Sequence, residues 1–256
     1  MTTLLLRPDT TAGTDTTEGT SAISLVALHS DLFARLDLAI EDQWAGAKAG
    51  RLWRHVTELG MNRDLYRLTM AQLFHYARHN SINQAVAVFR AEPEEIALLR
   101  FAYEHAKEEL GHERMILHDL RSSGLLRPDE PLADPLPATD ALINYLYGVA
   151  LREGPIPRLG YSYWAESAYR HIAPLLVATR DSLGLTDRQM TFFAAHAEID
   201  LRHAEQVRDI IRRTVTTPDR AEAVIRVAVT SLWLTIQILE QAFAGTAEGA
   251  LEMDES

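Results

Sequence analysis

The sequence contains no cysteine, and this absence excludes several classes of function at once. Disulfides, thiolate metal sites, iron–sulfur clusters and cysteine nucleophiles all need the missing side chain. Long apolar segments are scarce as well. The longest stretch, VAVTSLWLTIQIL, is interrupted by polar residues and is shorter than the roughly 20 residues that span a bilayer. We therefore expect no membrane-spanning segment.

Basic residues are fewer than acidic residues: the chain has 25 Lys and Arg residues and 36 Asp and Glu residues, which gives a net charge of -11. A phosphate backbone needs a basic face, so we expect no nucleic-acid partner. The first residues, MTTLLLRPDTTAGTDTTEGTSA, lack a charged region followed by a long apolar segment, and we expect no signal peptide. The expected location is the cytoplasm.

The length and composition predict one globular domain. The chain has 256 residues, of which 47% are hydrophobic and 24% charged, and no break in composition divides it. Residues 1–19 are rich in Thr, Gly and Asp, which predicts a disordered tail. Residues 246–256 are expected to form a frayed acidic end, and the domain itself is expected over residues 20–245.

No segment alternates in the manner of a β-strand, and apolar residues instead recur at helical intervals along almost the whole chain. The first apolar stripe consists of Leu25, Leu28, Leu32, Leu36 and Ile40. Further helices are expected over residues 52–59, 64–90, 93–121, 139–152, 156–183, 187–214 and 218–243. We predict an all-α fold of seven or eight helices.

One eight-residue formula occurs twice, as HAKEELGH from His105 and as HAEIDLRH from His196. Positions i, i+4 and i+7 of a helix lie within an arc of roughly 60°, so the ionisable groups of each copy are expected to share one helix face. Apolar residues flank both faces, and burying the polar groups is costly unless a partner satisfies them. The groups are His105, Glu109 and His112 in the first copy and His196, Asp200 and His203 in the second.

Two interpretations of this repeat compete. A single Glu-x-x-His is more often a solvated pair, whereas two copies of a three-residue ligand pattern favour a shared metal site. Imidazole and carboxylate ligands without thiolate suit iron, manganese or zinc. A site for two ions also needs a bridging carboxylate, and the best candidate is Glu166, which lies among aromatic and small residues in YSYWAESAYRH.

The helix expected over residues 64–90 contains no glutamate, although a ferritin-like bundle needs one before the first Glu-x-x-His. The segment offers Gln72, His75 and His79 instead. His75 lies among apolar residues and is a weaker candidate for a nitrogen ligand. The competing interpretation is an ordinary hydrogen-bonded core histidine.

Taken in chain order, these residues resemble the heme-oxygenase-like diiron oxidases. The resemblance covers about residues 21–245 and implies a bundle of about seven helices that holds no haem. It also implies that six residues bind two Fe(II) ions, with O2 as co-substrate. Some members place a glutamate ligand seven residues before the first-motif histidine, where this sequence has His105, which is therefore a weaker candidate ligand. The six residues are Glu109, His112, Glu166, His196, Asp200 and His203.

The resemblance implies an enzyme that uses O2 to activate an unreactive C–H bond, with desaturation, C–C cleavage, N-oxygenation or ring closure as outcomes. Two Fe(II) ions carry one more positive charge than Glu109, Glu166 and Asp200 neutralise, which favours a substrate carboxylate near the metals. We expect a free amino acid of specialised metabolism, with a fatty acid as the alternative. An external electron donor and a second copy of the chain are considered as further partners.

Other functions stay open at this point. A cofactorless oxidase on the same fold would not need two triplets of acid and histidine, and thiaminase chemistry would need a cysteine. Haem binding would need an accessible early histidine, for which His29 is the candidate. A metal-storage or interaction bundle is the non-catalytic alternative. Arg78 and Arg170 are candidates for pairing with a substrate carboxylate, although arginines on helices are usually solvated.

Overall fold

A computed structural model describes residues 16–250 except residue 248, and for residues 16–23 and 198–201 it describes the backbone alone. Within these residues the chain forms ten α-helices, two short 3-10 helices and no strand, which confirms the all-α prediction. The α-helices are α1 (Thr16–Ala49), α2 (Arg51–Leu59), α3 (Arg63–Ala87), α4 (Ile96–Glu109), α5 (Glu113–Ser122), α6 (Pro137–Arg152), α7 (Pro155–Ala165), α8 (Tyr169–Leu183), α9 (Thr191–Thr214) and α10 (Pro218–Ala244).

The predicted ends of the domain are only partly covered by the structure. Helix α1 begins at Thr16, inside the predicted tail 1–19, and residues 1–15 lie outside the described residues. Helix α10 ends at Ala244, next to the predicted domain end. Within the predicted acidic end, residues 248 and 251–256 also lie outside the described residues.

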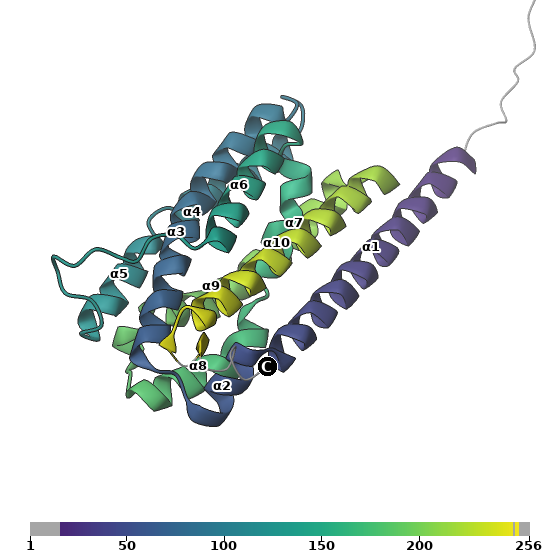
Figure 1. The fold of residues 1–256 in the computed structure, drawn as a ribbon. Helices are drawn as coiled ribbons and strands as arrows, with labels where there is room; N and C mark the ends of the chain where they lie inside the picture. The colour runs from purple at the N-terminus through teal and green to yellow at the C-terminus, as the bar shows by residue number, and fades with distance from the viewer. Residues whose placement is uncertain (1–15, 248, 251–256) are drawn as a thin grey trace, which may run out of the picture.

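Helix α10 forms the centre of the bundle. It packs against α1, α2, α3, α6 and α7, and in Figure 1 it crosses the molecule between α1 on one side and α3 and α6 on the other. The backbone of α7 approaches it closely at Gly160, where a Cβ atom would lie 2.1 Å from the carbonyl oxygen of Val224. A residue with a side chain cannot occupy this crossing without a shift of one helix.

Helix α10 is long and apolar enough to cross a membrane. This differs from the expectation that no segment of the chain has the length and composition of a membrane span. A core helix passes the same test. Val224, Ala228 and Leu232 of α10 are fully buried among its neighbours, and so are Leu32 and Leu36 of the stripe predicted on α1. These residues belong to one continuous hydrophobic core.

Two helices that were predicted as continuous are each split in two. The predicted helix 93–121 is divided into α4 and α5 around Gly111, whose φ of 95° is a conformation that residues with a side chain rarely adopt. The predicted helix 156–183 is divided into α7 and α8 by the turn of residues 166–168. Glu109, His112 and Glu166 therefore lie at helix ends, and the predicted face is shared by His105 and Glu109 only, because His112 lies beyond the break.

Candidate metal centre

The two helix breaks and helix α9 bring ionisable side chains together in the interior. Two groups can each direct one ligand atom per residue into a space where these atoms lie within 4.8 Å of one another. Glu109 belongs to both groups, so the two potential ion positions are adjacent. The first group is His105, Glu109, Glu166 and His203, all buried, and the second is Glu109, His112 and His196.

His203 of α9 is fully buried and is held from both sides of its ring. Nε2 lies 2.6 Å from Oε2 of Glu108, and because an ionised carboxylate only accepts, this nitrogen donates. Nδ1 faces the first group, 3.2 Å from Oε2 of Glu166 and 3.7 Å from Oε1 of Glu109. Burial lowers the pKa of His203, but the hydrogen bond to Glu166 and the nearby carboxylates outweigh burial and raise the pKa to about 9. The surroundings of Nδ1 thus favour a positive charge, either a proton or a metal ion.

Glu166, in the turn between α7 and α8, is the buried centre of the first group. Its Oε1 lies 3.0 Å from Nε2 of His105, and its Oε2 lies near His203. Burial raises the pKa of Glu166, but the hydrogen bonds to these two rings outweigh burial and hold the pKa at about 2. The far side of the His105 ring, Nδ1, lies 2.9 Å from Oε1 of Gln84, which accepts. The remaining nitrogen of His105 therefore points into the group.

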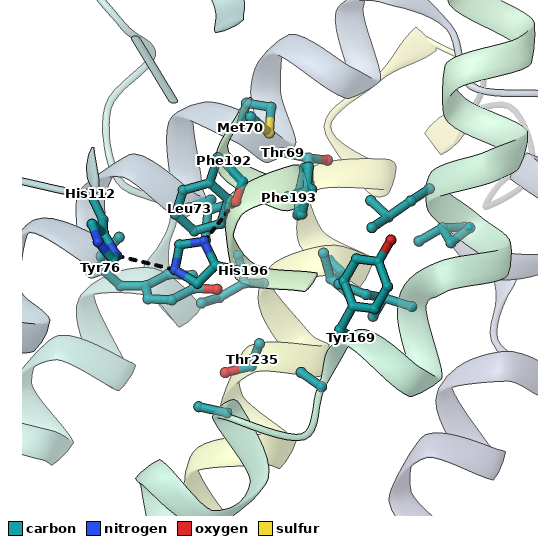
Figure 2. Close-up of a pocket in the computed structure, with 18 of the residues that line it drawn as sticks. Thr69, Met70, Leu73, Tyr76, His112, Tyr169, Phe192, Phe193, His196 and Thr235 are labelled. Carbon is teal, nitrogen blue, oxygen red and sulfur yellow. Dashed lines mark hydrogen bonds between the residues drawn. The ribbon is translucent and has the colours of Figure 1, made fainter. Parts of the chain in front are cut away.

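His196 repeats this arrangement in the second group. Its Nδ1 lies 2.6 Å from the carbonyl oxygen of Phe192, which can only accept, so Nδ1 donates and Nε2 carries a lone pair. Nε2 points at Nδ1 of His112, 3.2 Å away, as the dashed line in Figure 2 shows. The same His112 nitrogen lies 3.3 Å from Oε2 of Glu109. A cation between these atoms would satisfy all three.

These observations test whether a metal fits the residues present. His105, His196 and His203 each have one nitrogen fixed by an acceptor outside the groups, which leaves the other nitrogen directed inward. This is the usual orientation of metal-binding histidines. Oε1 of Glu109 is buried and has no hydrogen-bond partner among the described residues. With nitrogen and carboxylate donors and no thiolate, the set fits non-haem iron, and manganese or zinc by the same chemistry.

The remaining predicted residues either lie outside the two ligand groups or have side chains that the structure does not describe. Asp200 is on helix α9, but its side chain lies outside the described residues. His75, the weaker candidate, belongs to neither group, and its Nε2 lies 2.7 Å from the carbonyl oxygen of Ala133. Gln72 accepts hydrogen bonds from the Leu136 backbone and the Thr139 hydroxyl, so it ties the connector before α6 to α3.

Several residues whose side chains contact the two ligand groups were not predicted from the sequence. Besides Glu108 and Gln84, a partly buried chain of polar groups reaches Glu109 from α7: Nη2 of Arg158 lies 2.6 Å from Oδ1 of Asn80, and Nδ2 of Asn80 lies 3.4 Å from Oε2 of Glu109. Arg158 is almost fully buried, and burial lowers its pKa to about 10. The only signal in the sequence was the first glutamate in HAKEELGH, which is Glu108.

A cavity of about 210 Å³ opens from the two groups. Glu109, His112, Glu166 and His196 line one end of it, and Figure 2 shows His112 and His196 at one side of the pocket with Phe193 and Tyr169 beyond them. The rest of the lining comes mainly from apolar and aromatic side chains of α3, α8 and α10. They include Met70, Leu73, Ala77, Ile172, Leu175, Leu176, Ile238 and Leu239.

The cavity runs along helix α3 over several turns and is therefore elongated. Its lining on this helix extends from Asn80, beside Glu109, to Tyr66. These residues are 14 positions apart, which corresponds to roughly 21 Å along a helix axis. The shape therefore suits an extended molecule with one end at the ionisable groups.

Comparisons with known proteins agree with this geometry. A crystal structure of a domain of unknown function from Shewanella denitrificans, with a heme oxygenase-like fold, is 35% identical over 88% of this chain and 95% of that chain, with a TM-score of 0.79. Two less similar structures share the fold. A TenA homologue from P. horikoshii is 15% identical over 84% of this chain and 99% of that chain, with a TM-score of 0.66. A CADD-like protein of unknown function from Nostoc punctiforme is 14% identical over 86% of this chain and 99% of that chain, with a TM-score of 0.65. No curated protein matches the chain.

The model of one family, described as iron-containing redox enzyme, matches residues 67–235. The chain therefore belongs to the iron-containing redox enzyme family and has its heme-oxygenase-like fold.

Proposed function

We propose that the chain is a non-haem diiron oxidase that uses O2 to activate a C–H bond of a carboxylate with a long apolar tail. The observation that carries this proposal is the sharing of Glu109 between two groups of inward-directed donors at the end of one apolar cavity. Two adjacent ions and a substrate can then meet at a single place.

Each part of the centre has a role in this proposal. The bound iron pair would supply the reduction of dioxygen and the oxidation of the substrate. Glu109 would contact both ions, and His105, Glu166 and His203 would complete the first position. His112 and His196 would hold the second position, with Asp200 as the further predicted ligand. The apolar lining excludes water and confines the substrate chain against the centre, which determines the C–H bond that reacts.

The cavity favours the fatty-acid alternative over the free amino acid. An amino acid brings an ammonium group that needs a carboxylate partner when it is buried. Among the described lining residues, the carboxylates are Glu109 and Glu166, which the metals would use. The cavity walls beyond them offer apolar contacts along its whole length, and such contacts stabilise an alkyl chain.

The substrate carboxylate is assigned to the metal end by charge. Two Fe(II) ions and the buried Arg158 carry five positive charges, whereas Glu109, Glu166 and Asp200 supply three negative charges, so an anion is favoured there. Arg78 and Arg170, the candidates for this role from the sequence, do not line the cavity. Arg170 lies 3.0 Å from Glu41, and Arg78 lies over the ring of Phe74.

The test loads the protein with Fe(II) without oxygen, counts the irons by Mössbauer spectroscopy, and follows oxygen uptake with fatty acids or amino acids. We expect two irons per chain and oxygen uptake that medium-chain fatty acids accelerate. Protein that binds no iron, with or without substrate turnover, would support the cofactorless alternative, and many irons per chain would support storage. Acceleration by amino acids alone would overturn the substrate assignment. The electron donor, the homodimer and the cytoplasmic location stay predictions.

A further inference from the structure

Three polar atoms in the apolar cavity have no hydrogen-bond partner among the described residues. They are the hydroxyl of Tyr66, Oγ1 of Thr69 and Nε1 of Trp44. Tyr66 and Trp44 are each only 2% exposed. A buried donor without an acceptor is costly, and most proteins avoid it. Three such atoms in one cavity indicate that the cavity is built to meet a polar group.

Tyr66 and Thr69 lie toward the end of the cavity that is remote from the metal centre. These residues are three positions apart on α3, so they lie on one face with Cβ atoms roughly 5–6 Å apart. Tyr66 is separated from Asn80, at the metal end, by roughly 21 Å of helix. In Figure 2, Thr69 is drawn farther from His112 than His196 is.

The chemistry of this end defines the group that it would bind. Tyrosine and threonine hydroxyls can both donate a hydrogen bond. Outside the two metal-binding groups, the described residues that line the cavity include no lysine, arginine, histidine, aspartate or glutamate. A second charged group on the ligand would therefore lack a counter-ion there. A neutral acceptor oxygen, either a hydroxyl or a carbonyl oxygen, is the matching group.

We propose that the remote end of the cavity is a polar subsite, in which Tyr66 and Thr69 bind an oxygen atom at or near the end of the substrate's alkyl chain. The substrate is then an oxygenated fatty acid, such as an ω-hydroxy or oxo acid. The subsite fixes the chain by its tail while the carboxylate lies at the metals, so the two ends together set the position of each C–H bond. This assignment rests on the proposed function for the placement of the carboxylate.

The experiment compares binding of unmodified fatty acids and their ω-hydroxy derivatives to the Fe(II)-loaded protein without oxygen, by calorimetry, from octanoic to hexadecanoic acid. At one chain length we expect the ω-hydroxy acid to bind about tenfold more tightly than the unmodified acid, because only that length brings the oxygen to the subsite. Tyr66→Phe, and separately the isosteric Thr69→Val, should bring this affinity ratio close to one.

Tyr145→Phe is the matched control. The hydroxyl of Tyr145 is also buried without a partner among the described residues, but Tyr145 does not line the cavity. This variant should keep the tenfold ratio. Equal binding of both acids at every length, or a ratio that survives both Tyr66→Phe and Thr69→Val, overturns the subsite while the proposed function stands. If no fatty acid of either kind binds, the proposed substrate class fails, and the subsite fails with it.

Discussion

At the scale of single residues, Glu109 matters most because it is the one side chain common to both ligand groups. We predict that Glu109→Gln lowers the iron content by at least one ion per chain, since an amide oxygen is neutral and binds a hard cation poorly. Iron analysis after anaerobic loading and desalting measures this. Glu104→Gln, an exposed change on the same helix, should leave the iron content unchanged. Wild-type iron content in Glu109→Gln would contradict the shared position.

Glu108 supports the centre without belonging to either group. Its Oε2 accepts a hydrogen bond from Nε2 of His203, which orients the ring and makes Nδ1 a stronger ligand. We predict that Glu108→Ala weakens iron binding by roughly 10- to 100-fold in a chelator competition. Glu108→Gln keeps an acceptor oxygen and should lose less.

The control for Glu108 is Glu205→Gln, which removes an exposed negative charge from helix α9. This variant tests whether net charge alone changes the affinity. An equal loss of affinity in Glu205→Gln and Glu108→Ala, or no loss in Glu108→Ala, would show that the hydrogen bond to His203 has no role in metal binding.

At the scale of helices, the break between α4 and α5 determines where Glu109 and His112 point. Gly111 has a φ of 95°, and a Cβ at this position would meet no described atom within 4 Å. Gly111→Ala therefore isolates the backbone effect, and we predict a loss of about 1–2 kcal/mol in the free energy of unfolding, together with weaker iron binding. Urea denaturation measures the first effect.

Gly46→Ala provides the matched control on helix α1. A Cβ at Gly46 would also meet no described atom within 4 Å, and this glycine has no positive φ. Inside a helix the change should stabilise the protein by up to about 1 kcal/mol. If Gly111→Ala behaved like Gly46→Ala, the break would not depend on the left-handed conformation.

The helices themselves could be predicted from the sequence, but their breaks could not. Apolar periodicity identified every long helix, because each buries one face in the same core. The spacing of HAKEELGH predicts one continuous helix because it fits a helix face, and Gly111 alone does not signal an end. The turn at Glu166 contains no glycine or proline. The fold brings five residues of the doubled motif together, Glu109 and His112 from the helix break and His105, His196 and His203 from within α4 and α9. Gln84 and Glu108 could not be predicted, because they contact His105 and His203 only in the folded chain.

At the scale of the whole molecule, His171 should make stability depend on pH. This residue of α8 is 3% exposed, and its ring stacks on Trp44 of α1 at 5.2 Å between centroids. Burial lowers the pKa of His171 to about 4, with Arg170 and Lys48 acting in the same direction against Glu41. Since the unfolded pKa is about 6.5, the neutral ring favours folding above that pH.

The resulting contribution is lost as the pH falls from about 6.5 to about 4, and it amounts to at most about 3 kcal/mol. We predict that His171→Phe, which keeps the stacking, flattens the decline of unfolding free energy over this range in urea titrations. The exposed His118→Phe should retain the wild-type decline. An unchanged decline in His171→Phe would show that other groups cause the loss.

The proposed function requires that two metal ions lie side by side, both bound by Glu109, at the end of an apolar cavity. Anomalous diffraction at the iron edge from crystals of the anaerobically Fe(II)-loaded protein tests it most directly. We predict two iron peaks, one among His105, Glu109, Glu166 and His203 and one among Glu109, His112 and His196. A single peak, or iron positions that Glu109 does not contact, would contradict the account.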